Sequence, residues 1–270
     1  MRKIIYLVLL NLMSVQLSAQ INQETKSEKV ERMQWWTEAR FGMFIHWGLY
    51  ALPARHEWVM SNENMSKKTY EKYANYFNPD LYDPTEWAQL AKKAGMKYVV
   101  FTAKHHDGFS MYDSKYTDYK VTNTPFGRDA MKELIDAFRA EGIRIGLYYS
   151  LIDWHHPDFL VKDPIHPERN NKKELAKDSN RNLQNFQKYL KNQLTEILTN
   201  YGKIDILFTD FSYPHRENGK GKAYWNSEDL YGQIRKLQPQ IIINDRLDLK
   251  EEGGWDFMTP EQFMPKEWVT

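Results

Sequence analysis

The sequence DPTEWAQLAKKAGMKYVVFTAKHHD, residues 83–107, contains the signals of one helix followed by one strand. We expect Asp83 to cap the helix, with Pro84 at its first position and Glu86 completing a capping box. A glycine then ends the helical pattern, and the apolar run 96–102 predicts a buried strand. The stretch therefore predicts one helix–strand unit of a larger sheet.

The same unit occurs three more times along the chain. The apolar stripe of the first helix consists of Trp87, Leu90, Ala91 and Ala94. The expected strands cover residues 43–45, 96–102, 143–149, 204–208 and 241–243, with a possible sixth at 255–258. Helices that alternate with short, continuously apolar strands predict a parallel sheet covered by helices. No glycine-rich phosphate fingerprint opens a helix, which argues against a nucleotide-binding doubly wound fold.

Polar residues follow every expected strand. They are His46 and Trp47, then residues 104–107, 148–150, 209–210 and 244–246. In a (β/α) barrel the carboxyl ends of the strands meet at one mouth, where the active site lies. The sequence therefore predicts an α/β protein with a TIM-like (β/α) barrel, in which the strands form the core and their last residues face a cleft.

Composition and the N-terminus limit the possible functions. A formal net charge of +1 gives no electrostatic reason to expect nucleic acid as a partner. The absence of Cys excludes thiol nucleophiles, Cys-based zinc sites and disulfides.

Residues 1–19 combine a basic start, a short apolar core and a small-residue cleavage site, which is typical of a secretory signal peptide. We expect a protein exported to the periplasm or medium, a loose leader at 20–27 and no membrane span in the mature chain.

Three histidines at strand ends, His46, His105 and His106, can be interpreted in three ways. With a carboxylate they could hold zinc, they could be hydrogen-bonded structural residues, or they could bind the hydroxyl groups of a neutral polar ligand. The chain has no H-x-H strand or H-E-x-x-H helix. Adjacent side chains of a strand are also expected to point to opposite sides, which argues against a metal site.

Two carboxyls could support glycoside hydrolysis, which needs one on each side of the scissile bond. Asp210 directly follows an apolar strand, where it is either a loop cap or a functional group. Glu261, in WDFMTPEQF, could be the second carboxyl, although Thr-Pro-Glu-Gln is also a good helix start. Arg246 could hold a carboxylate or a sugar hydroxyl through its planar fork, or form a structural ion pair.

Five segments together resemble the α-L-fucosidases of glycoside hydrolase family 29: ARFGMFIHWGLYALPARHEWVM, YVVFTAKHHDGFSMYDSKYTDY, GLYYSLIDWHHPDF, ILFTDF and INDR. The resemblance runs in the expected order from about residue 28 to the C-terminus. It implies an irregular (β/α) barrel that removes terminal α-L-fucosyl residues from glycans by double displacement, without a cofactor or metal. The alternatives are a metal-dependent hydrolase of the same barrel type and a non-catalytic carbohydrate-binding protein.

The resemblance also implies roles for individual residues. Asp210 matches the nucleophile, and Glu261 matches a general acid/base position of some members, with Glu267 as a nearby alternative. The positions that match the fucose pocket are His46, Glu57, Trp58, His105, His106, Tyr148 and Arg246. Phe208 replaces a Trp that the family often carries two residues before the nucleophile.

The number of strands is smaller than a closed barrel of this type requires, which is eight. We therefore expect a catalytic domain over residues 28–270 that is truncated after about six strands, leaves its sheet open at residues 241–258 and lacks the C-terminal β-sandwich usual in the family. An open parallel edge exposes unpaired backbone groups. On its own, the chain is expected to be poorly soluble and to have little activity.

Overall fold

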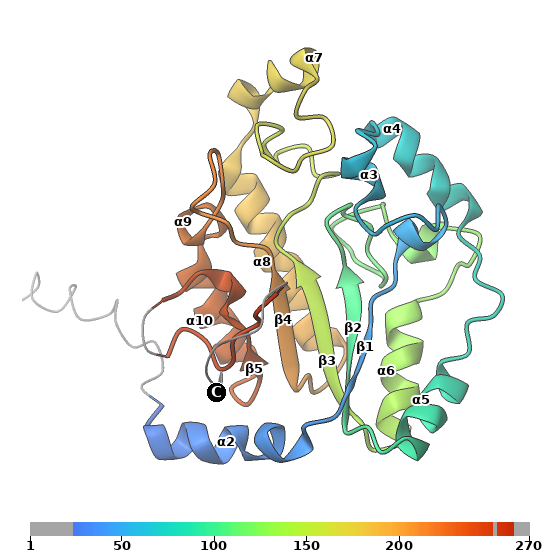
Figure 1. The fold of residues 1–270 in the computed structure, drawn as a ribbon, viewed down its shortest axis with the longest axis vertical. Coiled ribbons are helices and arrows are strands. Elements are labelled where there is room, and N and C mark those ends of the chain that lie inside the picture. Colours follow the sequence, from blue (N-terminus) through green and yellow to red (C-terminus); the bar gives the residue numbers. More distant parts are fainter. Residues whose placement is uncertain (1–23, 251–252, 262–270) are drawn as a thin grey trace, which may run out of the picture.

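Five parallel strands form one sheet in the computed structural model, which describes residues 24–250 and 253–261. The strands are β1 (Met43–Ile45), β2 (Tyr98–Lys104), β3 (Arg144–Ser150), β4 (Ile206–Asp210) and β5 (Ile242–Ile243). Their order in the sheet, β1-β2-β3-β4-β5, is also their order in the sequence, and the arrows of β2 and β3 point upward in Figure 1. This confirms the prediction of an α/β fold with a parallel sheet.

One helix of ten residues or more connects each strand to the next. These helices are α5 (Pro84–Lys93), α6 (Ala130–Ala140), α8 (Leu183–Asn200) and α10 (Ser227–Leu237). Long connections leave the carboxyl ends of the strands. They contain α3 (Val59–Asn62), α4 (Lys67–Tyr70), α7 (Lys172–Leu175), α9 (Lys222–Trp225) and five 3₁₀ turns, at Leu49–Ala51, Glu71–Tyr76, Val121–Asn123, Asp178–Asn180 and Asp245–Leu247. The segments α3, α4 and α7 lie together above the ends of β2 and β3 in Figure 1, so the longest connections gather on one side of the molecule.

Helix α5 has the predicted N-cap, Asp83, but among the described residues the Glu86 side chain accepts no hydrogen bond back from Asp83 to complete the expected capping box, and the helix buries a different face. The Asp83 carboxylate accepts a hydrogen bond from the Glu86 backbone N–H at 2.9 Å, with Pro84 in the first turn. Ala88 and Ala91 are buried, whereas Leu90 of the expected stripe is 55% exposed. The small alanines allow α5 to pack closely against α6, and this rotates the buried face away from Leu90.

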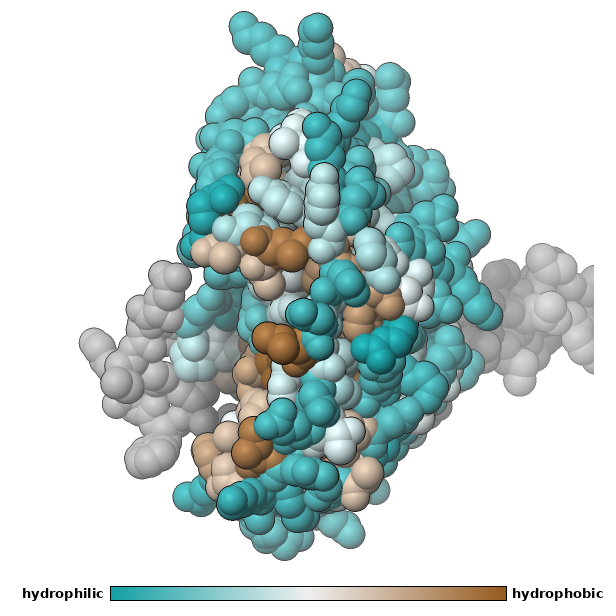
Figure 2. All heavy atoms as spheres, turned by 90° about the vertical axis from the view of Figure 1, so that its right-hand side faces the viewer, coloured by the Kyte–Doolittle hydropathy of each residue, from teal (hydrophilic) through white to brown (hydrophobic). Residues whose placement is uncertain are grey.

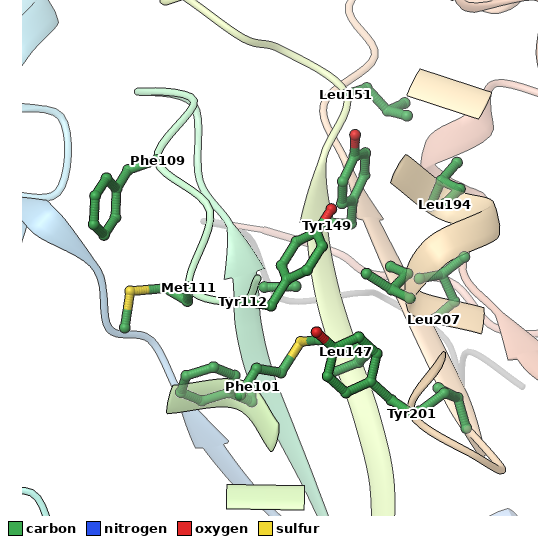
Figure 3. Packing of buried hydrophobic residues seen from close by; sticks show 14 of the residues in the cluster. Phe101, Phe109, Met111, Tyr112, Leu147, Tyr149, Leu151, Leu194, Tyr201 and Leu207 are labelled. Carbon is green, nitrogen blue, oxygen red and sulfur yellow. The ribbon is translucent and has the colours of Figure 1, made fainter. Parts of the chain in front are cut away.

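The main core lies between the sheet and its covering helices. Figure 3 shows Leu147 and Tyr149 of β3 and Leu207 of β4 near Leu194 of α8. Alternate residues of a strand point to opposite faces of a sheet. The other face of this sheet carries a second apolar cluster: Val100, Tyr148, Ile206, Ile242 and Phe257. Because both faces are covered by apolar side chains, the strands read as continuous apolar runs.

Helix α2 (Lys26–Ala39) extends along the lower edge of the sheet in Figure 1 and packs against this second cluster through Met33 and Trp36. Its N-cap, Thr25, forms a capping box with Glu28. The helix therefore begins inside residues 20–27, so the expected leader was extended too far toward residue 27 because the capping signal at Thr25 was overlooked. The expected signal peptide, 1–19, lies outside the described residues.

The possible sixth strand at 255–258 is reduced to a single parallel bridge between Asn244 and Phe257. The preceding residue, Asp256, instead pairs with the edge of β5: its N–H donates to the Ile243 carbonyl at 2.8 Å, and its carboxylate accepts the Ile243 N–H at 2.9 Å. A side chain thus takes over part of the strand pairing. The edge of β5 is less open than an unpaired parallel edge would be.

The face on the right-hand side of Figure 1 is mostly polar, with apolar residues in separate groups (Figure 2). None of the helices in the described part of the chain combines the length and apolar character that crossing a bilayer requires.

Candidate active site

His105 and His106 lie in the turn that follows β2. The pairing of β2 with β3 shifts register between Thr102 and Lys104, and the strand ends at Lys104. The two imidazoles lie next to each other, with ring centroids 4.1 Å apart and 34° between the ring planes. The expectation that they point to opposite sides is wrong, because the alternation of a regular strand does not continue through an irregularity and a turn.

The other two polar residues of KHHD are directed into the protein interior. The Lys104 ammonium donates to the Asp153 carboxylate at 3.2 Å and to the Tyr149 hydroxyl at 3.0 Å. Asp107 accepts hydrogen bonds from the Tyr70 hydroxyl and a backbone N–H, at 2.9 and 3.0 Å. Burial raises the pKa of Asp107 to about 7 in spite of these bonds. Only the two histidines of this stretch therefore face the site, and the expectation that all four polar residues face a cleft is wrong.

Asp210 is the last residue of β4 and lies at the centre of the site, with its side chain 13% exposed. The Tyr148 hydroxyl donates to its carboxylate at 2.8 Å, and Arg246 donates at 3.3 Å. His106 Nε2 lies 3.8 Å from the same carboxylate. Burial raises the pKa of Asp210 to about 6, while Arg246 and Tyr148 act to lower it. The carboxylate is therefore mostly ionised at neutral pH but poorly hydrated, which suits a nucleophile.

Arg246 connects the two candidate carboxyls. Its guanidinium donates to Asp210 and, at 3.0 Å, to Glu261. Thr259 orients the guanidinium by accepting from Nε at 2.8 Å and from a terminal nitrogen at 2.7 Å. The Glu261 side chain is 60% exposed. One carboxyl is thus nearly buried, and the other lies on the solvent side of the same arginine. Glu267 lies outside the described residues.

His46 completes a row of three imidazoles. Its ring centroid lies 4.9 Å from that of His105, and its Nδ1 lies 2.7 Å from the Tyr50 hydroxyl. The Tyr148 ring stacks on His105 at 5.8 Å. Burial lowers the pKa of His105 well below its usual value, and His105 Nδ1 is buried with no hydrogen-bond partner among the described residues. Neutral imidazoles with free nitrogen atoms are suited to binding hydroxyl groups.

His106 is fixed from the side opposite Asp210. Its Nδ1 lies 2.7 Å from the Ser150 hydroxyl oxygen, at the end of β3. Burial lowers the pKa of His106 to about 3, and the charges of His46 and Lys104 act in the same direction. This imidazole is therefore neutral at physiological pH.

Trp58 provides an apolar wall beside the histidines. Its ring contacts three other rings at centroid distances of 5.2, 5.8 and 5.9 Å: His106, Phe211 and Trp154. The neighbouring Glu57 lies 3.3 Å from His56. Burial lowers the pKa of His46, and the charge of Glu57 opposes this change.

The structure thus brings together the predicted site residues that contact one another: Asp210, Glu261, Arg246, Tyr148, Trp58, His46, His105 and His106. Glu57 directly precedes Trp58, and its side chain is 40% exposed. Sequence reasoning did not assign roles to Ser150, Tyr50 or Thr259, which hold the histidines and the arginine. The only available signal was the position of Ser150 at a strand end. Among the described residues, no group of three or more His, Asp or Glu side chains is arranged to hold a metal ion.

The family model for α-L-fucosidase matches residues 8–270 of the chain. The structure of α-L-fucosidase isoenzyme 1 from Paenibacillus thiaminolyticus is similar, with 51% sequence identity, a TM-score of 0.82 and coverage of 88% of this chain and 57% of that one. The α-L-fucosidase AlfC from Lactobacillus casei, in complex with α-L-fucose product, has 33% identity, a TM-score of 0.74 and coverage of 86% and 75%. A family 29 α-L-fucosidase from Bacteroides thetaiotaomicron, a trapped covalent intermediate, has 34% identity, a TM-score of 0.68 and coverage of 80% and 49%.

Curated relatives have similar names. The rat tissue α-L-fucosidase is 30% identical over 233 residues, which cover 79% of this chain and 46% of the relative. The human plasma α-L-fucosidase is 28% identical over 262 residues, which cover 87% and 52%. The chain spans about half the length of these curated relatives.

Proposed function

The chain belongs to the α-L-fucosidase family, and on this premise we propose that the protein is a retaining α-L-fucosidase that hydrolyses terminal α-L-fucosyl residues of oligosaccharides or glycoconjugates. The observation that carries the proposal is the environment of Asp210. This carboxylate is nearly buried, is held by Tyr148 and Arg246, and is joined through Arg246 to a second, exposed carboxyl. Retaining glycosidases use such a pair.

In the proposed reaction, an Asp210 oxygen forms a bond to the anomeric carbon while the bond to the leaving oxygen breaks. Glu261 gives its proton to that oxygen and then takes a proton from the water that releases fucose. The two carboxyl groups of retaining enzymes lie about 5–5.5 Å apart. Arg246, which contacts both, would keep them near this separation and would favour the ionised form of Asp210. No step requires a cofactor.

We assign the row of imidazoles, Glu57 and Trp58 to the sugar itself. His46, His105 and His106 would bind hydroxyl groups, and the free Nδ1 of His105 supports this assignment. The aromatic wall at Trp58 offers an apolar surface to the C6 methyl group, which distinguishes fucose from galactose.

We also propose that the five strands belong to a (β/α) barrel. Their sequential order supports this, because the strand order of a doubly wound sheet reverses at a switch point. Export through a signal peptide at residues 1–19 is proposed from the sequence signals alone.

The proposal is tested with aryl α-L-fucoside against a panel of other aryl glycosides, for the wild type and Asp210→Ala. We expect turnover of the fucoside only, at a low rate because the chain on its own is expected to have little activity, and a fall to the uncatalysed rate in the variant because the covalent step is removed. A chelator should have no effect. Chelator-sensitive hydrolysis would favour a metal-dependent enzyme, and fucose binding without turnover in the wild type would favour a binding protein.

A further inference from the structure

We infer that Ser150 is a positioning residue, which fixes His106 as a hydrogen-bond acceptor facing the bound sugar. The inference rests on the proposed function only in identifying the ligand as fucose. The direction of the hydrogen bonds follows from the groups around Ser150 and needs no assumption about the substrate.

The Ser150 hydroxyl has one hydrogen and two partners. It lies 2.8 Å from the Ile152 carbonyl oxygen and 2.7 Å from His106 Nδ1. A carbonyl can only accept, so the hydrogen of Ser150 is used by Ile152. The Ser150 oxygen must then accept from His106, which places a proton on Nδ1. If Ser150 instead donated its hydrogen to His106 Nδ1, lone pairs of the Ser150 oxygen and the Ile152 carbonyl oxygen would face each other at 2.8 Å in a buried site.

The other side of the imidazole agrees with this direction. His106 is neutral and has one N–H, so a proton on Nδ1 leaves Nε2 with a lone pair. Nε2 lies 3.8 Å from an Asp210 oxygen, which is longer than a hydrogen bond. An Nε2–H group would be expected to approach this carboxylate. A lone pair and a carboxylate, in contrast, should stay apart as observed.

Two acceptors therefore face each other across the position where the sugar would react. A fucose hydroxyl next to the anomeric carbon could donate to Nε2 of His106. In the absence of Ser150, the buried Nδ1–H would have no acceptor, and the proton would be better placed on Nε2, where Asp210 accepts it. The imidazole would then present a donor in place of an acceptor, and it would compete with the sugar for Asp210.

The tautomer can be measured by ¹⁵N NMR of histidine-labelled protein, because a protonated and an unprotonated ring nitrogen differ in shift and in coupling to the ring hydrogens. The His106 signals are identified by their absence in His106→Gln. In the wild type we expect a protonated Nδ1 and an unprotonated Nε2 near neutral pH. In Ser150→Ala we expect the proton on Nε2, and fucose affinity roughly tenfold lower, about the value of one hydrogen bond.

Ser150→Thr keeps a hydroxyl and should retain both the wild-type spectrum and most of the affinity. Ser227→Ala removes another buried hydroxyl and should change neither. A wild-type spectrum with Nε2 protonated would overturn the inference even if Ser150→Ala fails to fold, as would an unchanged tautomer in Ser150→Ala. The spectra need no turnover, so their outcome is independent of the fucosidase assay that tests the proposed function.

Discussion

At Asp210, burial and hydrogen bonding act in opposite directions on one carboxylate. Burial raises its pKa, and Arg246 and Tyr148 lower it, with a net rise to about 6. A pKa above that of the unfolded chain means that the ionised form costs stability in the folded state. The site therefore keeps a charge that would be more stable in water, which is the usual cost of a reactive group.

Asp210→Asn should make the protein more stable at pH 7 while removing hydrolysis. Because the folded-state pKa is raised, stability is greatest below the unfolded pKa and falls as pH rises through about 6. The gain in the variant should be about 1–3 kcal/mol at pH 7 and should vanish near pH 4. Urea unfolding at several pH values measures it. Asp136→Asn, which alters an exposed carboxylate, serves as the control and should show little change; a destabilised Asp210→Asn at pH 7 would contradict the assignment.

Tyr148→Phe should shift the acidic limb of kcat/KM to higher pH. The Tyr148 hydroxyl lowers the pKa of Asp210 by donating to it, so its loss should raise that pKa and require a higher pH for ionisation, by about one unit. Tyr82→Phe removes a buried hydroxyl that donates to a backbone carbonyl elsewhere and should leave the limb in place. An unchanged limb in Tyr148→Phe would mean that Asp210 does not control it.

The end of β2 shows where element-scale reasoning from the sequence succeeds and where it fails. The apolar run and the polar residues after it predict both the strand and its position at the site. The directions of the four polar side chains could not be predicted, because they depend on a shift in pairing between Thr102 and Lys104 and on a partner for Lys104, Asp153, 49 residues along the chain. Long-range pairing of this kind leaves no local pattern.

The helices were predicted better than the edge of the sheet. Caps are local signals, and Asp83 and Pro84 correctly predicted where α5 begins. Residues 255–258 look like a strand, but the carboxylate of Asp256 replaces a backbone group in the pairing. This substitution depends on two arginines from other elements, Arg32 of α2 and Arg235 of α10.

Asp256→Ala should destabilise the protein by about 3–5 kcal/mol, because it removes the carboxylate partner of the buried Arg235 and one of the two carboxylate partners of Arg32, which keeps Glu24. Although burial alone would raise the pKa of Asp256, Arg32, Arg235 and the Ile243 N–H hold it below its usual value. The stabilisation is therefore present above the unfolded pKa and is lost as pH falls through the lower folded value.

Chemical denaturation at pH 7 and at lower pH measures the effect of Asp256→Ala. The matched control is Asp229→Ala, which breaks an exposed ion pair with Lys191 at 2.7 Å and should cost less than about 1 kcal/mol. Equal losses in the two variants would show that Asp256 does not hold the edge of β5.

At the scale of the whole molecule, the site lies where one end of a parallel sheet meets the longest connections. The sequence predicted this placement because every strand is followed by polar residues. The expectation that the sheet is left open at residues 241–258 is wrong in part, because Asp256 pairs with Ile243 there. Residues 256–257 cover part of the β5 edge, whereas β1 pairs only with β2 among the described strands. On the second face, Phe44 of β1 is 44% exposed beside Phe208.

We expect the 270-residue chain to self-associate through the β1 edge and this partly exposed face, because unpaired strand edges and apolar surface favour association. Phe44→Lys should reduce the association measured by sedimentation velocity across a concentration series. Leu81→Lys changes a more exposed apolar residue in a loop away from the sheet and should have little effect. A monomeric wild type, or equal effects of the two variants, would contradict this prediction.

The central claim is that Asp210 is the nucleophile of a retaining α-L-fucosidase, and covalent trapping tests it most directly. In a 2-fluoro-fucosyl fluoride, the fluorine at C2 slows both formation and hydrolysis of the fucosyl-enzyme, and the good fluoride leaving group restores the rate of formation. The covalent intermediate therefore accumulates even where turnover is slow. Mass spectrometry of the intact protein and its peptides should show one added fluorofucosyl group, located on Asp210 and absent in Asp210→Ala. Hydrolysis of α-L-fucosides without a trapped adduct, or an adduct on another carboxylate, would contradict the account.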